Sequence, residues 1–170
     1  MKIETLQRAT EFMKTFSKFL AEYQDFTLAT DMFNNAVGTD LKCACGAVRE
    51  VVICNDFVVK WDYNIKNVKS LGGCDREFEV YNAIIDSKFS YLFAEIAPIQ
   101  IGKKTYWVMP RVKQMAYDLE NDDIDNYLSD EEMDFLYEEA IIYDLHSCNW
   151  GLIDGHPVII DYACGPESAS

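Results

Sequence analysis

The chain has 170 residues, with 15 Lys and Arg against 29 Asp and Glu, so its formal net charge at pH 7 is −14. This negative charge argues against nonspecific binding to nucleic acid or to an anionic membrane surface, but it suits a basic protein partner. Hydrophobic residues make up 49% of the sequence in short runs, so we expect a folded core, no membrane span and no signal peptide.

The N-terminal part of the chain is predicted to form one helix followed by a β-hairpin. Residues 4–23 place apolar side chains at helical spacing, and residues 34–42 have the composition of a loop. Two runs of β-forming residues, 48–54 and 57–63, then flank the turn dipeptide Asn55-Asp56. This pattern predicts two antiparallel strands joined by a tight turn.

The remaining elements alternate between helices and strands. We expect Asp75 to cap a helix over residues 76–89, followed by strands over 93–99 and 105–109, with Pro110 ending the sheet. Ser129 and Glu132 form a capping-box pattern that opens a helix over about 130–143. A short hairpin around Asp154-Gly155 closes the chain. This order predicts an α+β fold with a mainly antiparallel sheet.

The six cysteines show no CxxC pair and no regular spacing. Such a pattern favours free thiols in a reducing compartment over a disulfide framework or a zinc site. We therefore expect a cytoplasmic protein.

Three polar residues near the C-terminus have types that suit metal-assisted chemistry. Asp144 and Asn149 are separated by a short loop, and Asp161 closes the hairpin that follows. A carboxylate and an amide oxygen are ligands that suit Mg²⁺. A second carboxylate nearby can accept a proton from a hydroxyl group. Such a set fits transfer of a phosphoryl group from a magnesium-bound nucleotide.

The same stretch resembles the protein-kinase-like superfamily. Asp144-Leu-His-Ser-Cys-Asn149 resembles its catalytic loop, and Asp161-Tyr-Ala resembles its Asp-Phe-Gly element. The Asp-Leu-His variant is more similar to small-molecule and atypical kinases than to Ser/Thr and Tyr kinases. The resemblance implies ATP and Mg²⁺ as cofactors, with Asn149 and Asp161 as metal ligands and Asp144 as the catalytic carboxylate.

The resemblance extends to residues upstream. Phe57-Val-Val-Lys60 is similar to the strand whose lysine contacts the α- and β-phosphates. The glutamate that pairs with this lysine would be Glu77 or Glu79 on the next helix. We prefer Glu77, because Tyr81, Ile84 and Ile85 then share its inward side.

Residues 105–112 look like the strand and hinge that bind an adenine ring. The nucleotide-binding residues implied, besides Lys60, are Met109 at the back of the pocket, Arg111, Val112 and Gly46. The resemblance covers about residues 42–163. It divides the chain into an N-terminal helix and linker (1–40), an N-lobe-like sheet with one helix (41–112) and a reduced, mainly helical C-lobe (113–170).

The sequence departs from the family pattern at several points. Gly38 and Gly46 are present, but there is no GxGxxG, so fewer backbone amides could wrap a phosphate chain. Ile142-Tyr143 stands where protein kinases carry His-Arg, and Ala163 replaces a glycine. The 170 residues also contain no counterpart of the activation segment that seats a peptide substrate.

These departures keep other functions open. One is a non-catalytic, pseudokinase-like interaction protein that docks a basic protein through the acidic residues 118–139. Such a protein could be a phage or mobile-element inhibitor that acts on a host factor in the host cytoplasm. Another is a Mg-dependent phosphohydrolase built from Asp144, His146 and Asp161. The phosphoryl acceptor and the oligomeric state are not indicated by the sequence.

Overall fold

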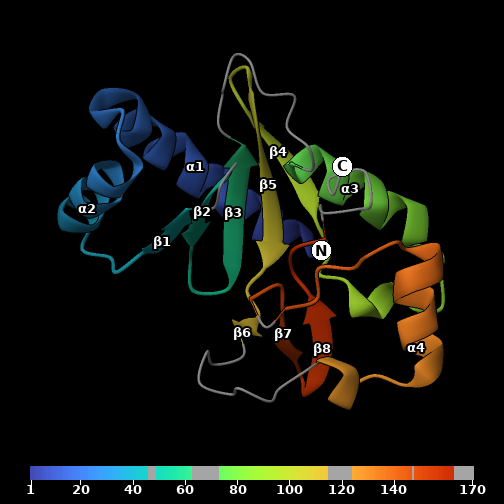
Figure 1. Cartoon of the computed structure of the whole chain (residues 1–170). Coiled ribbons are helices and arrows are strands. Elements are labelled where there is room, and N and C mark those ends of the chain that lie inside the picture. Colours follow the sequence, from blue (N-terminus) through green and yellow to red (C-terminus); the bar gives the residue numbers. More distant parts are fainter. Residues whose placement is uncertain (46–48, 63–72, 115–123, 147, 163–170) are drawn as a thin grey trace. The chain divides into compact units, whose positions relative to one another are not determined.

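The computed structural model describes residues 1–45, 49–62, 73–114, 124–146 and 148–162. It confirms the expected α+β class (Figure 1). The chain forms two compact units: one comprises Met1–Val68 and Ile96–Arg111, and the other comprises Lys69–Glu95 and Val112–Ser170. Among the described residues, no helix has the length and apolar character needed to cross a membrane.

Two helices begin the first unit. α1 spans Ile3–Tyr23, as its apolar spacing predicted. α2 spans Phe26–Val37, so the loop predicted over residues 34–42 is wrong for residues 34–37. Asp25 caps α2 by accepting a hydrogen bond of 2.8 Å from the backbone N–H of Leu28, and Gly38 ends it at φ 72°. A side-chain N-cap and a left-handed glycine are strong helix boundaries, and they place Gly38 at a helix end rather than in a phosphate loop.

Five antiparallel strands form the sheet of the first unit, in the order β1-β2-β3-β5-β4 (Figure 1). Their bounds are Lys42–Cys45 (β1), Arg49–Ile53 (β2), Phe57–Asp62 (β3), Ala97–Ile101 (β4) and Lys104–Pro110 (β5). The predicted hairpin is confirmed, since β2 pairs with β3, whereas β1 was not predicted. The strand predicted from residue 93 begins only at Ala97. Its expected first part pairs elsewhere, because the N–H of Ala94 donates to the carbonyl of Ile159 at 2.9 Å.

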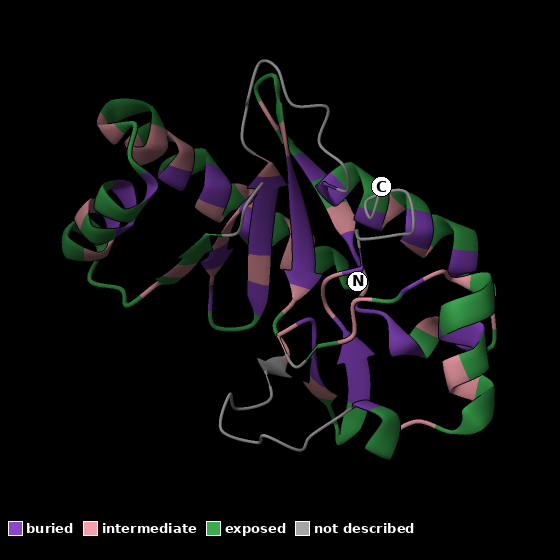
Figure 2. Cartoon of the chain, in the orientation of Figure 1, coloured by how far each residue is buried: buried purple, intermediate pink, exposed green. Residues whose placement is uncertain are grey.

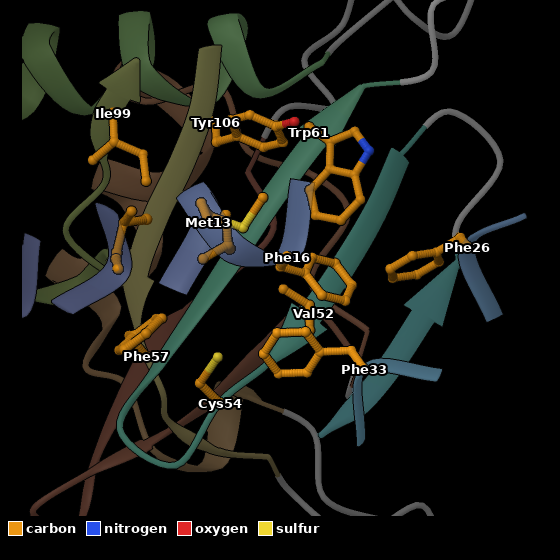
Figure 3. Packing of buried hydrophobic residues seen from close by; sticks show 13 residues of the cluster. Met13, Phe16, Phe26, Phe33, Val52, Cys54, Phe57, Trp61, Ile99 and Tyr106 are labelled. Carbon is orange, nitrogen blue, oxygen red and sulfur yellow. The ribbon is translucent and has the colours of Figure 1, made fainter. Parts of the chain in front are cut away.

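The core of the first unit lies between one face of this sheet and the two helices (Figure 3). Trp61 of β3 is its aromatic centre, with ring centroids 5.2 Å from Phe26, 5.5 Å from Tyr106 and 6.5 Å from Phe16. Because successive side chains of a strand alternate between faces, the residues between these core positions point to the opposite face. Figure 2 shows that β3 and β5 are buried along much of their length.

The second unit contains α3 (Cys74–Ile84) and a short 3-10 helix, η1 (Ser90–Leu92). The N-cap of α3 is Gly73 rather than the expected Asp75, and the helix ends before the predicted residue 89. Asp75 lies instead in the first turn, where a carboxylate interacts favourably with the helix dipole. The cap prediction was wrong because Gly73 supplies its backbone carbonyl, not a side chain, to the first helical amides.

The second predicted helix of this unit changes its winding halfway. It opens as α4 (Asp130–Asp134) with the predicted capping box, in which Glu132 accepts a hydrogen bond of 2.7 Å from the backbone N–H of Ser129. It continues as a π-helix, η3 (Phe135–Glu139), and then stops short of the predicted residue 143. Ile141 turns the chain with φ 58°, a left-handed conformation that is uncommon for a β-branched residue.

A three-stranded sheet completes the second unit, in the order β6-β7-β8. Its strands are Lys113–Gln114 (β6), Trp150–Ile153 (β7) and His156–Ile159 (β8), and a 3-10 helix, η2, spans Ile124–Asn126. The predicted C-terminal hairpin is confirmed. Asp154 and Gly155 both have positive φ, 52° and 85°, as a tight type I′ turn requires.

Of the cysteines expected to be free thiols, Cys43 and Cys54 are free in the structure. Burial is the largest cause that raises the pKa of the Cys54 thiol to about 12. Such a thiol is unreactive at neutral pH. The reducing compartment stays a prediction.

Candidate functional site

Lys60 lies in the middle of the first unit's sheet, on the face opposite α1 and α2. It pairs in register with Val51 of β2 and with Trp107 of β5. The residue is only 6% exposed, so its ammonium group is largely removed from water. Burying an ammonium is costly unless its charge is compensated, and Lys60 does have an interaction within the protein.

Met109 shares this face, because it pairs with Val58, two residues before Lys60. It is 1% exposed. Arg111 has a structural role at the turn between β2 and β3: its backbone N–H donates to Asp56 at 3.1 Å, and its side chain donates to the carbonyl of Cys54 at 3.2 Å. Val112 is half-buried and belongs to the second unit, and Gly46 lies outside the described residues.

Of the two glutamates considered as partners of Lys60, Glu77 is the buried one. Glu77 is fully buried on α3, whereas Glu79 is exposed and forms an ion pair of 3.6 Å with Arg76 on the same helix. A buried carboxylate requires a compensating group, while an exposed pair contributes little. The inward position expected for Glu77 is confirmed, whereas Ile85, expected on the same side, is exposed. The pairing of Glu77 with Lys60 stays a prediction.

Tyr162 connects Glu77 with the C-terminal carboxylate Asp161. Its phenol is buried and donates a hydrogen bond of 2.7 Å to the carbonyl of Ala94. Burial raises the pKa of Tyr162 strongly, and the charges of Glu77, Tyr81 and Asp161 raise it further. Both carboxylates therefore raise the pKa of one phenol, and all three residues belong to the second unit.

Asp144, Asn149 and Asp161 are held together by hydrogen bonds within the second unit. The side-chain Nδ2 of Asn149 donates to the main-chain carbonyl of Asp144 at 2.8 Å. The carbonyl of Asn149 in turn accepts from the backbone N–H groups of Ile160 at 2.7 Å and Asp161 at 3.2 Å. Because the amide nitrogen of Asn149 is occupied by Asp144, its oxygen Oδ1 is the atom that could act as a ligand.

His146 has a defined hydrogen-bonding role beside Asp144. Its Nδ1 accepts a hydrogen bond of 3.2 Å from the backbone N–H of Cys148, and its Nε2 lies 3.4 Å from Oδ1 of Asp144. In the neutral ring, an accepting Nδ1 places the proton on Nε2, facing the carboxylate. His146 is therefore placed to orient the carboxylate of Asp144. The second histidine, His156, is exposed at the start of β8.

The acidic segment predicted as a docking surface is partly used inside the second unit. In its described part, residues 124–139, the side chain of Glu131 forms an ion pair with Lys88, and Glu132 accepts a hydrogen bond of 2.5 Å from Tyr91. The other carboxylates described there are exposed: Asp125, Asp130, Asp134, Glu138 and Glu139. Residues 118–123 lie outside the described residues.

Within the described ranges, no group of three or more His, Cys, Asp or Glu side chains is arranged to hold a metal ion. The predicted pair, Asn149 and Asp161, supplies one amide and one carboxylate oxygen from backbone positions that are hydrogen-bonded to each other. This donor set fits Mg²⁺, which is usually bound by one or two protein groups and completes its coordination with water and phosphate oxygens.

Two buried residues were not singled out from the sequence. Tyr162 was considered only as the middle residue of the Asp161-Tyr-Ala motif, although its phenol donates a hydrogen bond to the carbonyl of Ala94. Arg49 is 7% exposed at the start of β2 and was not considered. An arginine within a run of β-branched residues, like the lysine of the next strand, is the signal that could have identified it.

No protein-family model, no curated protein and no solved structure matches this chain. The class stated here therefore depends on the structure alone, which is that of an α+β protein with a five-stranded antiparallel sheet.

Proposed function

We propose that this protein binds Mg-ATP and transfers a phosphoryl group to a hydroxyl-bearing acceptor, as a minimal kinase-like phosphotransferase. The observation that carries this proposal is the hydrogen-bonded set of Asp144, Asn149 and Asp161, which come from a loop and the end of a hairpin. The buried Lys60 on a central strand supports it, as does a helix that follows that strand and carries the buried Glu77.

In this proposal the phosphate chain is bound by the sheet. The ammonium of Lys60 contacts the α- and β-phosphates, and Glu77 serves as its counter-charge. The face that carries Lys60 also carries Met109, whose apolar side chain suits contact with a base. The proposal requires groups from both units to converge on one nucleotide, and this requirement is what the experiments below test.

Asn149 and Asp161 would hold the magnesium ion through Oδ1 of the amide and a carboxylate oxygen. The ion, when bound, neutralises negative charge on the phosphates. The hydrogen bond from Asn149 to Asp144 fixes the amide so that its oxygen, rather than its nitrogen, is available to the ion.

Asp144 would act as the catalytic carboxylate. The acceptor's O–H bond breaks as its proton passes to Asp144, the acceptor oxygen bonds to the γ-phosphorus, and the bond from that phosphorus to the leaving oxygen of ADP breaks. The Nε2–H of His146 faces Asp144 and positions its carboxylate, so His146 is a positioning residue. The side chain of Asp144 is 45% exposed, which leaves it accessible to an acceptor.

Thermal unfolding with increasing Mg-ATP tests the proposal. A ligand at a hundredfold excess over its Kd stabilises the native state by about 2.7 kcal/mol. We expect a saturable rise in melting temperature for the wild type that is lost in both Lys60→Met and Asp161→Asn, followed by transfer of labelled γ-phosphate to an acceptor or to the chain itself. A wild type that shows no ATP-dependent shift, or a shift that survives both substitutions, would refute the nucleotide site.

A second candidate is a non-catalytic binding protein that docks a basic protein surface. The observation in its favour is the series of exposed carboxylates on residues 125–139, where the described residues include no lysine or arginine. Charge complementarity of this kind steers association and makes it dependent on salt.

A pair of charge-reversed variants separates specific docking from the general effect of net charge. Glu138→Lys with Glu139→Lys changes the docking segment, and Glu4→Lys with Asp31→Lys makes the same charge change at exposed positions of α1 and α2. Binding to a defined basic peptide should fall in the first variant only. Equal losses in both variants would show that the segment has no specific role.

A further inference from the structure

Two exposed tyrosines of the second unit stack on each other. The rings of Tyr137 and Tyr143 have centroids 5.8 Å apart and planes inclined by 19°. Tyr137 is 37% exposed and Tyr143 is 55% exposed. Stacked pairs usually add to the packing of a core, but this tyrosine pair holds two large aromatic side chains at the surface. Exposed tyrosines that are fixed in place are typical of surfaces that bind proteins.

The backbone between the two tyrosines keeps the stack in place. After the π-helix η3, Ile141 turns the chain with φ 58°. The N–H of the buried Ile142 then donates back to the carbonyl of Leu136 at 2.8 Å. This turn brings the ring of Tyr143 back to that of Tyr137. Because folding has already ordered both rings, a ligand that contacts them loses little side-chain entropy.

The surroundings of the tyrosine pair are acidic. The exposed Glu138 follows Tyr137 directly, and Asp144, whose side chain is 45% exposed, follows Tyr143. The described residues within 124–162 include no lysine or arginine. Aromatic faces bordered by carboxylates attract a flat, weakly hydrated cation, because the ring quadrupole and the carboxylates both favour positive charge.

Two other exposed tyrosines of this unit differ from the pair. The phenol of Tyr91 donates to Glu132 at 2.5 Å, and the ring of Tyr127 packs against the buried Trp150 with centroids 5.3 Å apart. Both contacts join separate elements of the unit and explain why these tyrosines lie where they do. Tyr91 is 52% exposed, close to the exposure of Tyr143, so it serves as a matched control below.

We propose that Tyr137 and Tyr143 bind an arginine side chain of a basic protein partner. A guanidinium is planar, so it can extend the stack on the exposed ring of Tyr143 while its N–H groups point outward, in its own plane, to carboxylates. A lysine ammonium is compact and strongly hydrated, so it gains less from the rings. That the arginine belongs to a protein partner rests on the docking function proposed above; the tyrosine pair itself selects arginine over lysine.

Fluorescence anisotropy with the full chain tests this preference. The probes are labelled Gly/Ser peptides that carry arginine, lysine or citrulline at the same positions. The arginine peptide should bind about two- to fivefold more tightly than the lysine peptide, the range expected for one cation–π contact at an exposed site. Citrulline has the planar shape without the charge, so its peptide should bind most weakly.

Substitutions at residue 143 separate stacking from simple burial of apolar area. Tyr143→Phe keeps an aromatic face and should retain the preference for arginine. Tyr143→Leu keeps apolar area without that face, so it should bind the arginine and lysine peptides about equally. Tyr91→Leu is the control and should bind all three peptides as the wild type does.

Equal affinity of the wild type for the arginine and lysine peptides would overturn the inference without the use of any variant. A preference that survives in Tyr143→Leu, or that is lost equally in Tyr91→Leu, would overturn it too.

The same peptides separate this inference from the docking function. Binding that depends on Glu138 and Glu139 but not on Tyr143 would support docking and refute the role of the tyrosine pair. A preference for arginine that depends on Tyr143 and persists in Glu138→Lys with Glu139→Lys would support the tyrosine pair and refute docking through the acidic segment. A wild type that binds none of the peptides refutes both.

Discussion

Replacing Asn149 tests both the geometry of the candidate site and its chemistry. The buried side chain of Asn149 donates one hydrogen bond of 2.8 Å to the carbonyl of Asp144. Asn149→Ala removes this donor and leaves a carbonyl without it, which should cost about 1–3 kcal/mol of unfolding free energy. For a chain of this size, each kcal/mol lowers the melting temperature by about 2–4 °C. The expected decrease is therefore roughly 2–12 °C, measured by circular dichroism without magnesium.

Asn149→Asp separates the structural role from metal binding. An aspartate cannot donate to Asp144, so in EDTA this variant should be destabilised at least as much as Asn149→Ala. A carboxylate is, however, a better ligand for Mg²⁺ than an amide, so added Mg²⁺ should restore part of the stability of Asn149→Asp and none of that of Asn149→Ala. Asn82→Ala on the exposed side of α3 is the control and should change stability by less than about 0.5 kcal/mol. If both Asn149 variants melt like this control, the hydrogen bond and the reasoning built on it are refuted.

Three further predictions follow from single groups of the second unit. Tyr162→Phe removes the hydrogen bond to Ala94, so urea titration should show a loss of about 1–3 kcal/mol; an unchanged midpoint would contradict the bond. For Glu132, burial opposes ionisation, but hydrogen bonds from Ser129 and Tyr91 outweigh it and lower the pKa below its usual 4.5. Because the pKa of Glu132 is lower in the folded state than in the unfolded state, its stabilisation is present above pH 4.5 and is lost as the pH falls through the folded-state pKa. The difference in melting temperature between the wild type and Glu132→Gln should therefore shrink in that pH range. A difference that stays constant would contradict the lowered pKa. Removal of Mg²⁺ with EDTA should abolish most of the ATP-dependent rise in melting temperature, and a rise that persists would exclude a metal-dependent site.

The elements that the sequence predicted well are those whose pattern is local. The hairpin of β2 and β3 has alternating β-formers on both sides of Asn55-Asp56, and the turn at Asp154-Gly155 has residues that tolerate positive φ. The capping box of α4 likewise depends only on Ser129 and Glu132. In each case the residues that determine the structure are neighbours in sequence.

The elements that were missed depend on distant contacts. The sequence of α2 has a weak helical pattern, with Asn34-Asn35 near its end. The helix is bounded by its caps, Asp25 and Gly38, and is stabilised by the burial of Phe33 in the core. Residues 93–96 have the composition of a strand, yet Ala94 pairs with Ile159, far along the chain. The π-helix after α4 adds one residue to a turn, and no feature of its composition indicates this.

The candidate site shows the same division. Asp144 and Asn149 were identified as candidates by their residue types and spacing, and the hydrogen bond between them, which was not predicted, is local. The hydrogen bond from Tyr162 to Ala94 joins residues far apart in the sequence, and the burial of Glu77 and Tyr162 is visible only in three dimensions. The sequence could therefore identify these residues as candidates by their types, but it could not show which of them lie close together in the folded protein.

The two proposed functions make different demands on the buried charges. Docking a basic partner through exposed carboxylates requires nothing of Arg49 and Lys60, which lie on strands of the other unit. Burying charged groups in the interior is rarely stabilising, because loss of water offsets much of the attraction to a partner, and apolar residues of similar size often serve the fold as well. Arg49 and Lys60 both have interactions within the protein, so their burial does not by itself require a ligand. Lys60 is the residue that the nucleotide proposal uses and the docking proposal does not, so docking should be insensitive to Lys60→Met, whereas the ATP-dependent rise in melting temperature should be lost.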